Sequence, residues 1–292
     1  MFDPGIAAKG EGSTFPEKFV RVSARKHSAP GENSNSIQAP RHAIRAWPEI
    51  STRIHAAEYH ALLLDFDGTL VRLKRRPPQV RLSLRARHLL ERLAARRNLY
   101  VAIISGRDLP GLRNVAGVRG VHYFGSHGAQ REGKLTILSE RGSNALLHAR
   151  CAARKRLAGL AGIWIEDKGL SLAIHYRGAS EKIVKAAGLI TQRILTPLRD
   201  SLYLMEGLKV WEILPRELPG KGATARGLVE RMPKGSLTVY IGDDDTDETA
   251  FAALPHEITV RVGRKNGTHA GFYLSGPGEV LRFLSRFERE LR

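Results

Sequence analysis

The chain has 292 residues, of which 42% are hydrophobic and 26% are charged. This length and composition predict a folded protein with at least one large hydrophobic core and room for two domains. The single cysteine, Cys151, excludes an intramolecular disulfide, and no apolar run reaches the roughly 20 residues that a membrane span needs. We therefore expect a cytoplasmic protein without a membrane partner.

The 47 basic and 29 acidic residues give a formal net charge of +18, which favours anionic partners. The basic residues are spread over predicted helices, as in "LRARHLLERLAARR" at 84–97, and are not interleaved with aromatic residues. Aromatic side chains that stack on bases usually accompany single-strand binding. The pattern favours a solvated, arginine-rich surface over nucleic-acid binding, which stays a rival from a different class of function.

The first segment, residues 1–55, is rich in Gly, Pro, Ser, Asn and charged residues and has no sustained helical or strand period. It predicts a disordered or loosely attached N-terminal extension. After it, apolar runs alternate with helical patterns, at "ALLLDFD" (61–67), "YVAIISG" (100–106), "VHYFGSHG" (121–128), "LTVYIGDD" (237–244) and "EITVRVG" (257–263). These runs predict the buried strands of a Rossmann-like α/β parallel sheet, whose ligands bind at the carboxyl ends of the strands.

The rhythm changes between residues 131 and 216. Helices are expected near 143–158 and 180–197, and strands at "GIWIEDK" (162–168), "LSLAIHYR" (170–177), "LYLMEG" (202–207) and "KVWEILP" (209–215). An α-β-β-α-β-β block within an α/β chain predicts an inserted α+β cap domain at 131–216. The core that it interrupts is then formed by residues 56–130 and 217–292.

Carboxylates crowd the segment "GDDDTDE" at 242–248, which contains Asp243, Asp244, Asp245, Asp247 and Glu248. Such crowding destabilises the charged state unless a cation, a helix dipole or hydrogen-bond donors lie among the acids. A second acidic pair, Asp65 and Asp67, follows a predicted strand in "LLLDFDGTL" at 62–70, and the pair points to one face of that strand. If the two strands are neighbours, Asp65 and Asp243 can share one Mg²⁺, which binds few carboxylates and keeps several waters.

Two other types of site fail on spacing. An EF-hand loop needs Gly at its sixth position, where counting from Asp243 gives Glu248, and counting from Asp65 puts Gly68 at the fourth position. A Walker P-loop needs Ser or Thr after its lysine, whereas Gly222 follows Lys221. Neither a calcium loop nor a nucleotide-phosphate cradle is expected.

Four segments occur in a characteristic order: "DFDGTL", "IISGR" (103–107), Lys221 and "GDDDTDE". In this order they resemble the four motifs of haloacid dehalogenase-like phosphatases. The resemblance implies that Asp65 attacks phosphorus to form an aspartyl-phosphate, and that Asp67 protonates the leaving oxygen and later deprotonates water. It further implies that Ser105 and Lys221 hold the phosphoryl oxygens.

The same resemblance implies a Mg²⁺ site formed by Asp65, the main-chain carbonyl of Asp67, and Asp243. Asp244 and Asp247 are expected to support these ligands. Simpler interpretations remain open for the single motifs, since Ser105 or Asp243 could cap a helix and Lys221 could be a surface cation.

From about Ala61 to Phe283 the chain also resembles trehalose-6-phosphate phosphatases, through "GSHGAQ" (125–130), "EDKGLSLAIHYR" (166–177) and "GLKVWEILP" (207–215). The resemblance implies hydrolysis of trehalose 6-phosphate to trehalose and phosphate, the second step of the usual route of trehalose synthesis. A functional link to a trehalose-6-phosphate synthase is compatible with it. The residues that it implies as ligands of the sugar hydroxyls are His127, Glu166, Lys168, Arg177, Lys209 and Glu212.

Structural alternatives stay open for these cap residues. The charged residues among them could form a solvated network at a strand edge, and His127 and His175 could be satisfied structural histidines. Trp211 is expected in the hydrophobic core and not on a sugar-stacking surface. Gln130 stands where similar phosphatases usually have an acidic residue, which leaves its contact with substrate open.

Two further rivals remain for the function. A related phosphatase acting on sucrose phosphate or mannosyl phosphoglycerate would use the same core motifs with a different cap. A noncatalytic sensor of sugar phosphates would bind with Mg²⁺ and release no phosphate.

Overall fold

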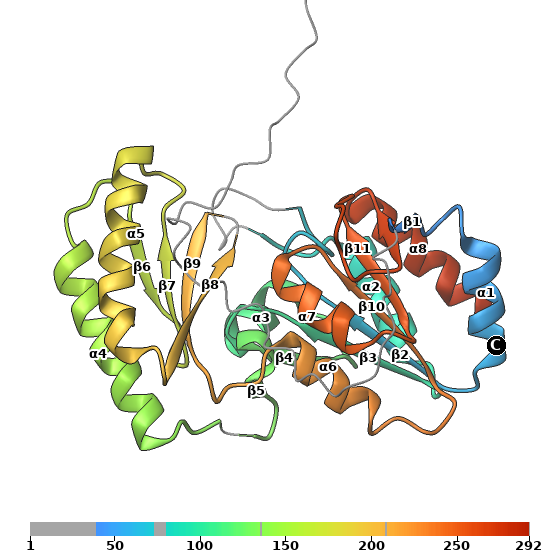
Figure 1. The fold of residues 1–292 in the computed structure, drawn as a ribbon. Coiled ribbons are helices and arrows are strands. Elements are labelled where there is room, and N and C mark those ends of the chain that lie inside the picture. Colours follow the sequence, from blue (N-terminus) through green and yellow to red (C-terminus); the bar gives the residue numbers. More distant parts are fainter. Residues whose placement is uncertain (1–38, 73–79, 135, 208, 292) are drawn as a thin grey trace, which may run out of the picture.

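The computed structural model describes residues 39–72, 80–134, 136–207 and 209–291, which form two α/β units (Figure 1). The larger unit contains strands β1 (Arg41–His42), β2 (His60–Leu64), β3 (Leu99–Ile104), β4 (His122–Gly125), β5 (Gln130–Arg131), β10 (Leu237–Gly242), β11 (Ile258–Val262) and β12 (Phe272–Leu274). They form one sheet in the order β1-β12-β11-β10-β2-β3-β4-β5. Neighbouring strands are parallel except β5, which is antiparallel to β4.

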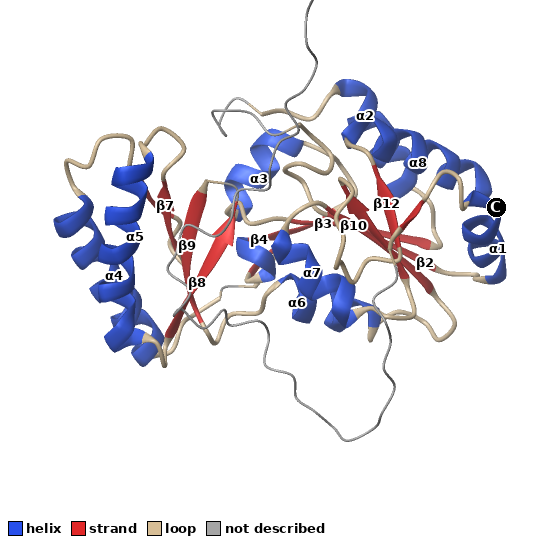
Figure 2. Ribbon diagram, turned by 45° about the horizontal axis from the view of Figure 1, so that its top comes forward, coloured by secondary structure: helices blue, strands red, loops and turns tan. Residues whose placement is uncertain are grey.

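Both faces of the large sheet are buried, because apolar side chains alternate between them with the two-residue period of a strand. In β2, Leu62 and Leu64 belong to one hydrophobic cluster, whereas Ala61 and Leu63 belong to the other. The first cluster includes residues of α1 (Trp47–Ala56), α2 (Leu84–Ala94), α3 (Leu109–Ala116) and α8 (Pro277–Glu290), and the second those of α6 (Lys221–Val229) and α7 (Asp245–Ala253). Figure 2 shows this three-layer arrangement, which confirms the predicted Rossmann-like parallel sheet.

The smaller unit has its own sheet and core. It contains α4 (Glu140–Leu157), β6 (Trp164–Asp167), β7 (Leu172–His175), α5 (Glu181–Leu195), the 3₁₀ turn Thr196–Leu198, β8 (Leu202–Gly207) and β9 (Val210–Pro215). The antiparallel strands lie in the order β6-β7-β9-β8. Helices α4 and α5 cover the face of this sheet that points away from the large unit (Figure 1). The α-β-β-α-β-β order of its elements is the predicted one, whereas Arg131, which was expected in the inserted domain, belongs to β5 of the large sheet. This smaller unit is called the cap below.

The prediction that residues 1–55 form a disordered or loosely attached extension is wrong for residues 41–55. Strand β1 pairs with β12, and α1 packs on the core through Trp47, Ile50 and Ile54. The three residues recur at helical spacing and bury one face of the helix. Residues 1–38 lie outside the described residues. No helix in the described ranges is long and apolar enough to cross a membrane.

Replacing Trp47 tests how firmly this N-terminal segment belongs to the core. The indole is 5% exposed, meets the ring of Phe283 edge-to-face at 5.2 Å, and donates from Nε1 to Glu290 Oε1 at 2.9 Å. We expect Trp47→Ala to lower the free energy of unfolding by about 3 kcal/mol, and Trp47→Phe to cost clearly less. Urea unfolding measures both, and an unchanged midpoint for the alanine variant would mean that the segment is loosely held.

Candidate active site

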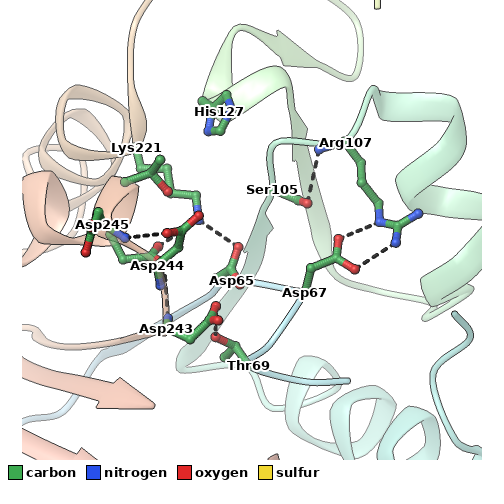
Figure 3. Close-up of polar contacts among 12 residues, drawn as sticks. Asp65, Asp67, Thr69, Ser105, Arg107, His127, Lys221, Asp243, Asp244 and Asp245 are labelled. Carbon is green, nitrogen blue, oxygen red and sulfur yellow. Dashed lines mark hydrogen bonds and ion pairs between the residues drawn. The ribbon is translucent and has the colours of Figure 1, made fainter. Parts of the chain in front are cut away.

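Three parallel strands end together at one edge of the large sheet. Strand β2 lies between β3 and β10, and the residues that follow these strands are Asp65, Ser105 and Asp243. Their side chains converge on one site, together with Lys221 at the start of α6 (Figure 3). The structure therefore brings together the residues that the four sequence motifs singled out.

Lys221 is the buried cation of this site. Its Nζ donates to Asp65 Oδ1 at 2.7 Å and to Asp247 Oδ1 at 2.8 Å, and the side chain is 3% exposed. Burial opposes the ammonium charge, but Asp247 and Asp65 outweigh it, so the pKa of Lys221 lies well above its ordinary value. The interpretation of Lys221 as a surface cation is wrong.

Asp247 is fully buried and accepts four hydrogen bonds. Besides Lys221, Oδ1 accepts from the Tyr240 hydroxyl at 2.8 Å, and Oδ2 accepts from the backbone N–H groups of Asp243 and Asp244 at 3.1 and 3.0 Å. Asp244 is the N-cap of α7 and forms a capping box with Asp247. Asp247 thus fixes the loop that carries Asp243, as a supporting residue would.

The remaining acids of the crowded segment are paired on the outside of α7. Asp245 is bonded to Lys265, and Glu248 Oε1 accepts from Arg261 Nη1 at 2.6 Å and from the Thr268 hydroxyl at 2.7 Å. These partners leave Asp243 as the acid of the segment that faces Asp65. Crowded carboxylates need hydrogen-bond donors or cations beside them. For most acids of this segment, these are basic side chains and backbone N–H groups.

Asp65 is bonded to Lys221 through Oδ1 alone, and Asp243 forms no ion pair with a described side chain. Asp65 Oδ2 is buried without a hydrogen bond, and Asp243 Oδ1 accepts only a 3.3 Å bond from the Thr69 hydroxyl among the described side chains. Gly68 has φ +88°, and a Cβ there would stand 1.9 Å from Asp243 Oδ2, so this close approach of the two loops requires glycine. The carboxylates are held against each other by the fold.

This pair has the properties of a cation site. Burial raises the pKa of Asp65 to about 7 against the opposing effect of Lys221, and burial with repulsion from Asp65 raises the pKa of Asp243 to about 9. One oxygen from each of Asp65, Asp243 and Asp247 lies within 4.8 Å of the others. Since Asp247 already accepts four bonds, Asp65 and Asp243 are the better donors. Hard oxygen donors on two carboxylates fit Mg²⁺.

The loop after β3 adds a hydroxyl and a guanidinium. Ser105 is 1% exposed, and its Oγ accepts from the Arg107 backbone N–H at 3.2 Å. Asp108, and not Ser105, caps α3. Arg107 binds both oxygens of Asp67, with Nε–Oδ2 at 2.5 Å and Nη2–Oδ1 at 2.7 Å (Figure 3). Asp67 is therefore engaged by a bidentate ion pair that the sequence motifs did not predict.

A second cluster connects the cap to the core through the buried carboxylate of Glu212 on β9. It accepts from Lys168 Nζ at 3.2 Å and from the Ser171 hydroxyl at 2.5 Å, and it lies 3.2 Å from His127 Nε2. Lys168 Nζ also donates to the Gly106 carbonyl at 3.1 Å. Lys168 thus contacts the loop after β3 at Gly106, the residue next to Ser105, and Glu212 contacts the loop after β4 at His127.

The Glu212 cluster gives a pH-dependent stability. Burial opposes the charge of Glu212, but Lys168 and His127 outweigh it, so its pKa lies well below the ordinary value. A carboxyl with a lowered folded-state pKa adds stability above its unfolded pKa, and this stability is lost as pH falls through the folded value. We expect Glu212→Gln to cost about 3 kcal/mol at pH 7 and about 1 kcal/mol less than that at pH 3.5.

Urea unfolding at the two pH values measures this difference. Glu181→Gln is the matched control, because Glu181 forms an exposed pair with Lys185, whose loss should leave the free energy of unfolding nearly unchanged at both pH values. An equal cost of Glu212→Gln at both pH values would contradict the stabilising role of its charge.

The other predicted cap residues lie on or beside the strands of the cap sheet. Glu166 Oε2 is 2.9 Å from His175 Nε2, whereas Arg177 lies exposed beyond β7 and Lys209 lies at the turn between β8 and β9. Trp211 is fully buried in the cap core, as expected. Gln130 Oε1 accepts from the Leu109 N–H at 2.8 Å and thereby holds the start of α3.

Sequence reasoning missed several polar residues of the site. Arg107 belongs to the segment "IISGR", and a guanidinium two residues after Ser105 is a natural partner for a nearby carboxylate. Thr69, Ser171 and Tyr240 each bond one of the predicted acids. No local pattern identifies them, because the partners of Thr69 and Ser171 are distant in the sequence, and that of Tyr240 lies across the loop between β10 and α7.

Comparison with known proteins identifies the family. The model of the family described as trehalose-phosphatase matches residues 63–271, which include the strands and loops that form this site. The chain belongs to the trehalose-phosphatase family. The match spans both the core and the cap.

Among the relatives, the trehalose-phosphate phosphatase of Mycobacterium tuberculosis (strain H37Rv) is 32% identical over 251 residues, covering 81% of this chain and 63% of the relative. That of Mycolicibacterium paratuberculosis is 33% identical over 254 residues, covering 81% and 64%. The chain thus spans less than two thirds of the length of these relatives. The C-terminal domain of Candida albicans trehalose-6-phosphate phosphatase shares the fold, with a TM-score of 0.72, 22% identity, and coverage of 87% of this chain and 99% of that domain.

Proposed function

We propose that this chain is a Mg²⁺-dependent phosphatase that hydrolyses trehalose 6-phosphate to trehalose and phosphate. The observation that carries the proposal is the buried Asp65 carboxylate, which is bonded to Lys221 beside Asp243, while a polar cap cluster contacts the neighbouring loop at Gly106. Membership of the trehalose-phosphatase family supports this choice of substrate over sucrose phosphate or mannosyl phosphoglycerate.

In the first step, an oxygen of Asp65 attacks phosphorus, and the bond from phosphorus to the sugar oxygen breaks. Asp67 gives a proton to that leaving oxygen. Lys221, which is charged and fixed between Asp65 and Asp247, holds a phosphoryl oxygen, and the Ser105 hydroxyl holds another. The products of this step are the free sugar and an aspartyl-phosphate.

In the second step, Asp67 takes a proton from water, whose oxygen attacks phosphorus while the bond to Asp65 breaks. Phosphate is released and both carboxyl groups return to their starting forms. Asp65, Asp243 and the main-chain carbonyl of Asp67 would hold Mg²⁺, which when bound offsets the repulsion between the acids and the charge on the phosphoryl group.

The cap supplies the polar groups for the leaving sugar. Glu212, Lys168 and His127 are charged or polar groups in a buried cluster at the contact between cap and core. Such groups favour a ligand whose hydroxyls satisfy them, because burial makes an unpaired polar group costly. The remaining cap candidates, Glu166, Arg177 and Lys209, are proposed as further sugar ligands.

The pairing of Asp67 with Arg107 leads to a test of the acid. Because both oxygens of Asp67 are engaged, Arg107 orients the carboxylate, and its loss should impair proton transfer to the sugar oxygen. We expect Arg107→Gln to lower kcat on trehalose 6-phosphate by about 10- to 100-fold. An aryl phosphate, whose leaving group needs no proton, should be affected much less.

Asp67→Asn provides the reference for this comparison, since it should show the same dependence on the leaving group with a larger loss. If Arg107→Gln lowered turnover of both esters equally, Arg107 would act on the phosphoryl group and not through Asp67.

Phosphate release tests the proposed function. Trehalose 6-phosphate, sucrose 6-phosphate, glucose 6-phosphate and an aryl phosphate are compared with Mg²⁺ and with a chelator. The proposal predicts the highest kcat/KM for trehalose 6-phosphate and loss of turnover with the chelator. Preference for another ester would overturn the substrate, and binding of sugar phosphate without turnover would favour the sensor. The cytoplasmic location and the synthase link stay predictions from the sequence.

A further inference from the structure

Among the described residues, the cap helices cover one face of the cap sheet, and the opposite face carries an exposed indole. Ile165, Ile174 and Trp211 occupy paired positions on β6, β7 and β9 and belong to the core beneath α4 and α5. Side chains alternate along a strand, so Trp164 on β6 and His175 on β7 point to the opposite face. That face is turned toward the large unit (Figure 1).

Trp164 is 53% exposed, whereas Trp47 is 5% exposed and Trp211 is fully buried. Its ring is stacked on that of His175, with centroids 4.4 Å apart and planes inclined by 25°. The two residues are partners in the β6–β7 register. An aromatic ring held flat against a second ring is a rigid apolar surface, and about half of Trp164 is accessible to solvent.

Polar groups lie on the same face of the sheet between this surface and the core unit. His175 Nε2 lies 2.9 Å from Glu166 Oε2, and Glu166 is level with Glu212 across Ala173 on the intervening strand. Glu212 in turn contacts His127 of the core. Trp164 and Glu166 are two residues apart on β6, so they are separated by about 7 Å, the breadth of about one sugar ring.

We propose that Trp164, supported by His175, is the platform for the sugar ring that does not carry the phosphate, and that it selects disaccharide over monosaccharide phosphates. A pyranose ring has an apolar C–H face that packs on an aromatic ring and hydroxyl edges that bond to neighbouring carboxylates. Trp164 offers the aromatic ring for the C–H face, and Glu166 and Glu212 offer the carboxylates for the hydroxyls. This inference rests on the proposed function.

The predicted effect of Trp164→Ala is on substrate binding. Since Trp164 would contact a ring remote from the reacting bond, its contribution is equal in the ground state and the transition state and appears in KM. We expect Trp164→Ala to raise KM for trehalose 6-phosphate about tenfold with kcat unchanged. KM for glucose 6-phosphate, which has no second ring, should stay unchanged, and Trp164→Phe should restore most of the loss.

Leu147→Ala is the matched control. Leu147 lies on α4, outside the sheet, and is 53% exposed like Trp164, so its removal should leave both KM values unchanged. If Trp164→Ala raised both KM values by the same factor, or neither, the platform would be overturned. If the wild-type protein released no phosphate from trehalose 6-phosphate, the proposed function would fail first and independently of the variant.

Binding of free trehalose gives a readout without catalysis. Trp164 is the exposed one of the three tryptophans, so trehalose stacking on it should change the intrinsic fluorescence of the wild-type protein. The change should vanish in Trp164→Phe and persist in Trp47→Phe. A fluorescence response that survives in Trp164→Phe would show that trehalose binds elsewhere.

Discussion

Asp65→Asn is expected to lower kcat for trehalose 6-phosphate by about 10⁴-fold or more, because the amide cannot form the acyl-phosphate bond. The fold should survive. The amide oxygen can still accept from Lys221, and the amide nitrogen can donate toward Asp243. The substitution also removes the repulsion between the carboxylates of Asp65 and Asp243. Without metal, the melting temperature of the variant should therefore equal or exceed that of the wild type.

Asp245→Asn is the matched control for this substitution. Asp245 belongs to the same acidic segment but is exposed and paired with Lys265 on the outside of α7. Its amide variant should keep activity within about twofold, as expected for an exposed ion pair. Wild-type turnover by Asp65→Asn, measured as phosphate release with folding checked by circular dichroism, would remove Asp65 as the nucleophile.

Lys221→Met is expected to lower kcat/KM by about 10³-fold and the free energy of unfolding by about 3 kcal/mol. The substitution removes the buried cation that bonds Asp65 and Asp247, while the methionine side chain retains comparable apolar volume. The uncompensated carboxylates then lose both a hydrogen bond and an opposite charge. Activity and stability should fall together, unlike the result for Asp65→Asn.

A double-mutant cycle separates the charge effect from packing. In Lys221→Met with Asp65→Asn, one of the carboxylates that Lys221 compensates is also gone. The double variant should therefore be more stable than the sum of the single effects predicts, by about 1 kcal/mol or more. Urea unfolding of the four proteins measures this coupling, and strict additivity would mean that the cost of Lys221→Met is steric.

The strands of the large sheet could be predicted from the sequence because each is a short apolar run that ends in small or acidic residues. Parallel strands end at the same edge, so Asp65 and Asp243 could be expected near each other once β2 and β10 were assumed to be neighbours. The helix at Trp47–Ala56 was missed although Trp47, Ile50 and Ile54 follow a helical period. The polar composition of the preceding residues obscured this short signal, and the two residues of β1 are too few for any period.

The details of the site depend on contacts between distant segments. The sequence could not predict that Arg107 binds Asp67, because a long side chain adopts the rotamer that its folded surroundings favour. In the cap, side chains alternate between the two faces of a short strand such as β6, but the sequence does not indicate which of these faces the helices cover. The burial of Trp211 was predicted, whereas the exposure of Trp164 on the opposite face required the structure.

The most direct test of the account is transfer of labelled phosphoryl from trehalose 6-phosphate to the protein. Rapid acid quench of the wild-type protein with Mg²⁺ and ³²P-labelled substrate should trap the label on the peptide that contains Asp65, as an acyl phosphate that hydroxylamine releases. Asp65→Asn should carry no label. Phosphate release during turnover without labelled protein, or label on another residue, would contradict the proposed role of Asp65.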